Sequence, residues 1–93
     1  MIFNNQAYDA TTDAILAIVP DGYARRSGNY PACDLPKEPI YSKLAEAMGL
    51  WARTVSEPEK LSSILQESLE VVRGGRSALV DISVASPRPR ADK

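Results

Sequence analysis

The segment SALVDISV at residues 77–84 is the strongest β-strand signal in the chain. Its first half is nearly continuous in apolar residues, which is typical of a strand that is covered on both faces in a parallel sheet. Asp81 lies inside this run. We interpret it as capping a neighbouring polar group near the edge of the sheet, in preference to a ligand. The segment therefore predicts a buried strand in an α/β fold.

The sequence before this strand predicts a helix and a second strand. Ser56 and Glu59 fit a capping box at the start of the helix, and Pro58 is tolerated in its first turn. Gly74-Gly75 ends it. One face of the helix carries apolar residues at helical spacing: Leu61, Ile64, Leu65, Leu69 and Val72. Residues 50–55 predict a short strand, and Trp51 within it is expected to pack in a core or an interface.

A further helix is predicted over residues 40–48, with Gly49 as its left-handed cap. Its apolar face consists of Ile40, Tyr41, Leu44, Ala45 and Met48. Residues 20–39 are punctuated by proline and glycine and predict a long irregular connection.

The first residues of the chain predict the end of a strand followed by a helix. Ile2 and Phe3 are apolar, and Asn4 and Asn5 then break the strand. Residues 9–19 predict a helix that Asp9 caps and proline 20 stops. The second half of this helix is so apolar that we expect burial on more than one side.

Strands that alternate with helices predict an open parallel α/β sheet with flanking helices and right-handed crossovers. The expected sheet is partial, because one of its three strands is only a strand end. We therefore expect other strands to complete it. Residues 1–86 are predicted to form this partial domain, and residues 87–93, with two prolines and three basic residues, a disordered tail.

Composition and charge narrow the class of protein. A formal net charge of −1 argues against nucleic acid as a partner, and no apolar run is long enough to predict a membrane span. The start of the chain has no basic segment before its apolar residues, so we expect no secretory signal. The single cysteine, Cys33, suits a reducing cytoplasm. The chain has no histidine, which excludes Ser-His-Asp and Cys-His nucleophile pairs within it.

Four segments resemble the thiamine-diphosphate-dependent enzymes. Residues 2–8, IFNNQAY, are similar to the closing half of the family's bipartite motif, which begins with Gly-Asp-Gly and ends with an asparagine pair. YSKLAEAMG at 41–49 resembles the family's helix with a Leu-Ala pair that ends on glycine. SEPEKL at 56–61 resembles its cap and helix start, and GGRSALVDI at 74–82 resembles the last strand of its diphosphate-binding domain. The likeness is greatest to the acetolactate synthase and benzoylformate decarboxylase branch.

The resemblance implies two cofactors, thiamine diphosphate and Mg²⁺, in the intact family enzyme. It places Asn5 as a metal ligand through its side-chain oxygen and Ala7 as a metal ligand through its main-chain oxygen. Tyr8 is expected near the cofactor, although packing under the first helix explains it equally well. Asp9 stands where many relatives have glycine and would bring negative charge near the diphosphate.

Two elements that such an enzyme needs are missing from this sequence. The motif's aspartate would precede Met1, and the activating glutamate lies on another domain. We therefore expect no catalytic residue here and weak or no cofactor binding by this chain alone.

Two functions remain open at this point. The first is a C-terminal fragment of a 2-oxo-acid decarboxylase or carboligase that lies in the cytoplasm. It would work as a homo-oligomer or with a complementing chain. The second is a non-catalytic interaction or oligomerisation module derived from such an enzyme, because an incomplete sheet exposes strand edges. A small flavodoxin-like nucleotide binder is disfavoured because the chain has no glycine-rich phosphate loop.

Overall fold

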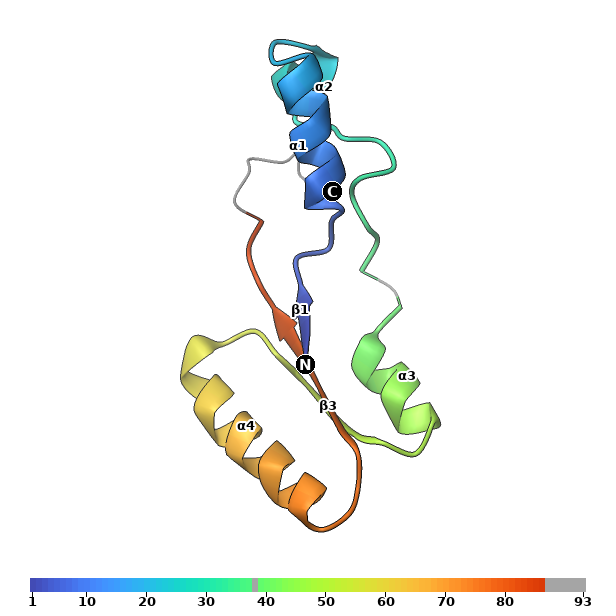
Figure 1. Ribbon diagram of the computed structural model, residues 1–93, viewed down its shortest axis with the longest axis vertical. Coiled ribbons are helices and arrows are strands. Elements are labelled where there is room, and N and C mark those ends of the chain that lie inside the picture. The colour runs from blue at the N-terminus through green and yellow to red at the C-terminus, as the bar shows by residue number, and fades with distance from the viewer. Residues whose placement is uncertain (38, 87–93) are drawn as a thin grey trace. The chain divides into compact units, whose positions relative to one another are not determined.

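A computed structural model describes residues 1–37 and 39–86 of the chain and shows two compact units (Figure 1). The first unit is Met1–Asn5 with the described part of Glu38–Val84. The second is Gln6–Lys37 with the described part of Ala85–Lys93. The predicted disordered tail, 87–93, lies outside the described residues. Within the described ranges, no helix is both long and apolar enough to span a membrane.

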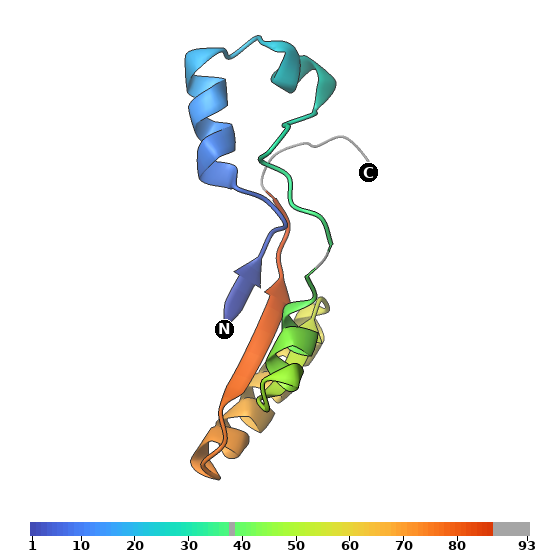
Figure 2. The same cartoon turned by 90° about the vertical axis from the view of Figure 1, so that its right-hand side faces the viewer.

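The first unit is built on a parallel sheet of three strands, as the sequence predicted. The strands are β1 (Ile2–Asn4), β2 (Trp51–Val55) and β3 (Ala78–Ser83), and their order in the sheet is β1-β3-β2. Figure 2 shows β1 and β3 side by side and pointing the same way. β3 is the central strand, and three successive residues of it are buried: Val80, Asp81 and Ile82. The prediction of a strand covered on both faces is confirmed.

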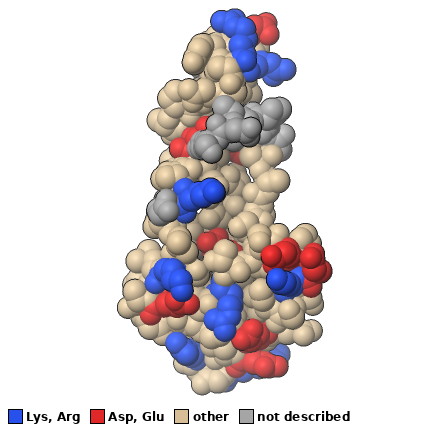
Figure 3. All heavy atoms as spheres, turned by 180° about the vertical axis from the view of Figure 1, so that it is seen from behind, with Lys and Arg blue, Asp and Glu red and all other residues tan. Residues whose placement is uncertain are grey.

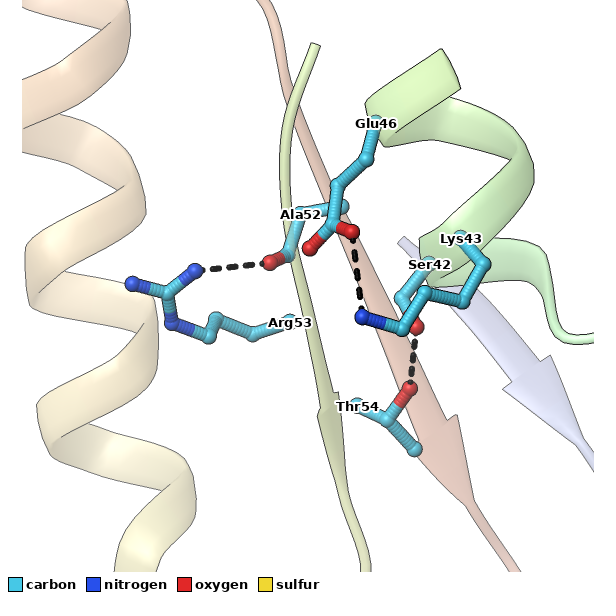
Figure 4. A network of polar contacts seen from close by, with 6 residues as sticks. All are labelled: Ser42, Lys43, Glu46, Ala52, Arg53 and Thr54. Carbon is cyan, nitrogen blue, oxygen red and sulfur yellow. Dashed lines mark hydrogen bonds and ion pairs between the residues drawn. The ribbon is translucent and has the colours of Figure 1, made fainter.

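Two helices cover the sheet from opposite sides of β2 (Figure 4). Helix α4 (Pro58–Arg73) packs on the face that carries the hydrophobic core, formed by Trp51, Val55, Val80 and Ile82. Helix α3 (Tyr41–Ala47) lies on the other face, where the hydroxyl of Thr54 donates to that of Ser42 at 2.9 Å. Successive residues of β2 point to opposite faces, so Arg53 is directed toward α4 while Thr54 is directed toward α3.

The buried faces of α3 and α4 differ from the predicted stripes. In α3 the buried residues are Ser42 and Ala45, whereas Leu44 is 53% exposed and Met48 is 71% exposed. In α4 the core-facing side includes Val71, while Leu69 and Val72 are each 54% exposed. The sheet is narrow, and each helix therefore covers it with only part of its apolar stripe.

The glycines that end α3 and α4 were predicted correctly, whereas the cap at the start of α4 was not. Gly49 and Gly75 adopt positive φ angles of 84° and 89°, as expected for glycines that follow helices. The capping box at Ser56 is wrong, because Glu57 is the N-cap residue and makes no side-chain capping bond. Glu57 instead forms an ion pair with Lys60 at 3.1 Å. Pro58 occupies the first turn as predicted.

The second unit contains α1 (Asp9–Ile18) and a short helix, α2 (Tyr23–Ser27), that was not predicted. Tyr8 is the N-cap residue of α1, so Asp9 lies in the first turn and does not cap it. Thr12 is the buried residue of α1, and Ile18 is 80% exposed. Burial of this helix on more than one side is therefore wrong for this chain, because the small unit offers few side chains to cover it.

Candidate cofactor-binding site

Asn5 directly follows the carboxyl end of β1. The strand pairs in parallel with β3, with Asn4 opposite Ser83, and the amide of Val84 donates to the carbonyl of Asn4 at 2.9 Å. Asn5 is half-buried. The carboxyl ends of parallel strands are where open α/β sheets bind their ligands. The first unit therefore places this side chain at the edge where a ligand is expected.

Gln6 has a φ of 55°, in the left-handed region. This conformation is uncommon for a residue with a side chain and is found at turns and strained functional positions. Gln6 separates the two predicted metal ligands in sequence, Asn5 and Ala7.

Ala7 and Tyr8 lie at the start of the second unit, where they pair with a segment distant in sequence. Ala7 forms an antiparallel bridge with Asp34. The amide of Tyr8 donates to the carbonyl of Cys33 at 2.6 Å, and the amide of Leu35 donates to the carbonyl of Gln6 at 2.7 Å. We call the two paired segments, Gln6–Tyr8 and Cys33–Leu35, the neck. Residues 6–35 therefore form a loop that is closed at its base.

The side chain of Tyr8 is 58% exposed, so it does not pack under α1. The carbonyl of Tyr8 accepts the first hydrogen bonds of α1, from the amides of Thr11 and Thr12 at 3.1 and 3.2 Å. The hydroxyl of Thr12 donates to the same oxygen at 3.4 Å. Tyr8 is thereby held through its backbone.

Asp9 brings a carboxylate to the first turn of α1, where the helix dipole favours negative charge. The hydroxyl of Ser86 donates to its Oδ2 at 3.2 Å. The same helix end would also favour the phosphate groups of a ligand. The negative charge of Asp9 therefore offsets part of the positive potential at the helix end that would attract a phosphate group.

The sequence suggested that Asp81 lies near the edge of the sheet, and this prediction is wrong. Asp81 lies in the central strand, is 3% exposed, and its Oδ1 has no hydrogen-bond partner among the described residues. Its register partners are Ile2 on one side and Thr54 on the other. Asp81 therefore caps no neighbouring group through Oδ1, and it is buried inside the strand, away from the carboxyl ends.

The described residues contain no group of three histidine, cysteine or carboxylate side chains that could hold a metal. A metal at residues 5–7 would therefore rest on amide and backbone oxygens. Oxygen ligands of this kind suit a hard cation such as Mg²⁺. The donor chemistry fits the cation, although two oxygens are only part of the roughly six that it needs.

Surface charges of both signs are intermingled on the face seen in Figure 3. Among the described residues, ion pairs join Lys43 with Glu46 at 3.2 Å, Arg53 with Glu67 at 3.5 Å and Lys60 with Glu57 at 3.1 Å. Arg53 also stacks over Trp51, 4.6 Å from the ring centre, and Trp51 is only 9% exposed. The prediction that Trp51 packs in the core is confirmed.

The structure adds two features that the sequence reasoning missed. One is the neck, because no local pattern pairs residues 33–35 with residues 6–8. The other is a cavity of about 210 Å³ at the carboxyl ends of β2 and β3, beside the start of α4. Its lining consists of Val55, Ser56, Glu57, Pro58, Leu61, Ile82, Ser83 and Val84. This cavity could have been expected from the sequence, because ligand sites in parallel sheets form where the carboxyl ends of neighbouring strands meet.

Comparison with protein families gives a match over residues 1–82 to the family described as the thiamine pyrophosphate enzyme, C-terminal TPP binding domain. Comparisons with curated proteins and with solved structures gave no match. The match includes β1, β2, all of β3 except Ser83, α1 to α4, and the residues Asn5, Ala7 and Tyr8. Together with the parallel sheet and its flanking helices, it shows that the chain belongs to the C-terminal, cofactor-binding domain family of the thiamine-diphosphate-dependent enzymes.

Proposed function

We propose that this chain supplies part of the Mg²⁺-diphosphate site of a thiamine-diphosphate-dependent enzyme. The family match over residues 1–82 carries the proposal. The position of Asn5 directly after a parallel strand supports it, because ligands bind at that end of such sheets. Asn5 would give its amide oxygen to the metal, and Ala7 its backbone oxygen. Tyr8 would lie beside the cofactor.

The remaining metal ligands would come from the cofactor and from other protein groups. Mg²⁺ commonly combines one or two protein oxygens with phosphate oxygens and water. With two oxygens of its own, this chain is expected to bind the metal and cofactor weakly, with a dissociation constant above about 1 mM. We therefore propose that it acts as a homo-oligomer or with a complementing chain.

The reaction we propose is the decarboxylation of a 2-oxo acid or the joining of two such carbon units, as in acetolactate synthase. The sequence resemblance of residues 41–49, 56–61 and 74–82 supports this branch of the family. Bound thiamine diphosphate supplies a carbanion-stabilising centre for chemistry of this kind. The residues of this chain bind and orient, and none of them is assigned a proton transfer. We place this function in the cytoplasm, because a chain with a single cysteine suits a reducing compartment.

The test follows backbone amide NMR signals of the chain during a titration with thiamine diphosphate and Mn²⁺. Mn²⁺ accepts the same oxygen ligands as Mg²⁺ and broadens the signals of nearby nuclei. Broadening is expected to centre on Asn5, Ala7 and Tyr8. The Asn5→Ala variant should lose it. Asn4→Ala and Asn29→Ala should keep it, because these asparagines are not proposed as ligands.

Two results would count against this function. Broadening that is spread over the acidic residues of the surface would indicate non-specific metal binding. A response that persists unchanged in Asn5→Ala would remove this side chain from the metal site.

The second candidate, a non-catalytic association module, is favoured by exposed apolar residues in the outer strand β1 and just before it. Met1 is 72% exposed and Phe3 is 68% exposed. Association with no localised response to the cofactor would support this candidate over the first. Static light scattering over a concentration series, with and without cofactor, separates the two.

A further inference from the structure

The neck brings two strained residues close to the same pair of backbone hydrogen bonds. Gln6, with a φ of 55°, lies in its first segment, and Ala32, with a φ of 63°, directly precedes its second. These are the non-glycine residues with positive φ among those that the structure describes. Such conformations persist only where the surrounding structure over-determines them, and they gather at functional sites. The left-handed conformation of Gln6 inside the neck therefore indicates that the geometry of the neck matters. The conformation of Ala32 belongs to the local turn Tyr30–Cys33, in which the amide of Cys33 donates to the carbonyl of Tyr30.

The pairing pattern in the neck sets the direction of the backbone at Ala7. The two hydrogen bonds beside the Ala7–Asp34 bridge are made by the flanking residues: Tyr8 with Cys33 and Leu35 with Gln6. In an antiparallel pair of this type, the residue in the middle directs its own N–H and C=O away from the opposite segment. The carbonyl of Ala7 is therefore directed away from Cys33–Leu35, and the two flanking bonds fix that direction.

The second segment of the neck is itself anchored in the small core of the second unit. Cys33 is 1% exposed, Tyr30 is 4% exposed and Thr12 of α1 is fully buried. The amides of Cys33 and Asp34 both donate to the carbonyl of Tyr30, at 3.0 and 3.3 Å. Cys33–Leu35 is thus a fixed segment, against which residues 6–8 are held.

We propose that Cys33–Leu35 is the segment that positions the carbonyl of Ala7 for the metal. This inference rests on the proposed function, in which that carbonyl is a ligand. The three residues act through Ala7 and touch neither metal nor cofactor. A preorganised ligand oxygen binds more tightly than one that must be ordered on binding. Opening of the neck should therefore weaken the metal site, and an occupied site should keep the neck closed.

The first experiment removes one neck hydrogen bond by the substitution Leu35→Pro, since proline has no amide proton to donate to Gln6. Leu35→Ala is the matched control, because it shortens the same side chain and keeps the amide. In the full chain with Mn²⁺ and thiamine diphosphate, Leu35→Pro should weaken the localised response at Ala7 by about five- to tenfold. Leu35→Ala should retain it. The amide signals of Thr12 and Tyr30 report whether the second unit keeps its fold.

A second measurement uses the unmodified chain and its single cysteine. Cys33 is buried, so its reaction with a thiol reagent requires local opening of the second unit, to which the neck belongs. By the reciprocity of coupled equilibria, occupation of the metal site should slow this reaction. Amide hydrogen exchange at Val80 in β3 reports opening of the first unit. Occupation of the metal site should slow the reaction of Cys33 by a larger factor than it slows this exchange.

The outcomes separate the two proposals. A localised response in the unmodified chain that persists unchanged in a folded Leu35→Pro variant would overturn the positioning role alone. Unchanged Cys33 reactivity at full occupancy would do the same, even if Leu35→Pro does not fold. Absence of a localised response in the unmodified chain, at cofactor and metal concentrations far above the expected dissociation constant, would overturn the proposed function, and the positioning role with it.

Discussion

At the scale of single residues, the side chain of Asp81 is a carboxyl group buried in the central strand of the sheet. It is 3% exposed and its Oδ1 accepts no hydrogen bond from the described residues. Burial of a carboxylate without a partner costs more than burial of a neutral group of the same shape. Asp81→Asn should therefore raise the free energy of unfolding by about 1–3 kcal/mol at neutral pH. Urea denaturation followed by circular dichroism measures this change.

The control for this substitution is Asp21→Asn, at an exposed position. It should change the free energy of unfolding by less than about 0.5 kcal/mol. A loss of stability in Asp81→Asn would mean that the carboxylate makes a stabilising interaction in the folded protein.

The sequence predicted a left-handed conformation at Gly49, and it predicted that Gly74-Gly75 ends a helix without assigning Gly75 a left-handed conformation. Gly49 and Gly75 follow helices and have positive φ. Gln6 and Ala32 could not be predicted in the same way, because nothing in these residue types favours that conformation. Gln6 lies where the chain pairs with a distant segment, which local sequence does not encode. Ala32 follows Pro31 in the turn Tyr30–Cys33, which the amide of Cys33 closes by donating to the carbonyl of Tyr30.

At the scale of elements, the two ends of the apolar stripe on α4 should differ in their contribution to stability. Leu61 packs against the core formed by Trp51, Val55, Val80 and Ile82, whereas Leu69 is 54% exposed. Leu61→Ala is expected to lower the free energy of unfolding by about 2 kcal/mol. Leu69→Ala is expected to change it by less than about 0.5 kcal/mol. Thermal or urea denaturation of the two variants, which remove the same atoms from one helix, gives the comparison.

Equal losses in the two variants would show that Leu69 is also packed in solution, for example against a partner. The sequence predicted this helix and its approximate face, because helical spacing identifies a stripe. It could not identify which part of the stripe meets the sheet. That depends on where β2 and β3 lie beneath the helix, and Val71 contacts the core in place of Val72 for this reason.

At the scale of the whole molecule, the parallel sheet followed from the sequence, but the order of its strands did not. Alternating strands and helices predict parallel pairing. The position of β3 between β1 and β2 is determined by tertiary packing. It places the strand with three successive buried residues in the centre of the sheet. The candidate ligands Asn5 and Ala7 were found by resemblance to a motif. The backbone pairing of each, with β1 before Asn5 and the neck around Ala7, required the structure.

The same strand order leaves β1 as an outer strand with exposed apolar side chains, and this predicts association. Phe3 is opposite Ile82 in the register and is 68% exposed. Outer strands of this kind pair with other chains, and natural proteins block such pairing with charged side chains, lysine above all. We therefore expect concentration-dependent self-association of this chain, and Phe3→Lys should weaken it by about tenfold or more. Static light scattering coupled to size-exclusion chromatography measures the change.

Leu69→Lys is the matched control, because it places the same charge at another exposed apolar position, on α4. If β1 carries the contact, this variant associates like the unmodified chain. If both variants weaken association equally, general apolar exposure is responsible and the edge has no special role. If the unmodified chain is monomeric at every concentration, the outer strand needs a partner other than its own copy. That result would favour a complementing chain, because a strand donated along β1 would cover Phe3 and extend the parallel sheet on the side next to Asn5.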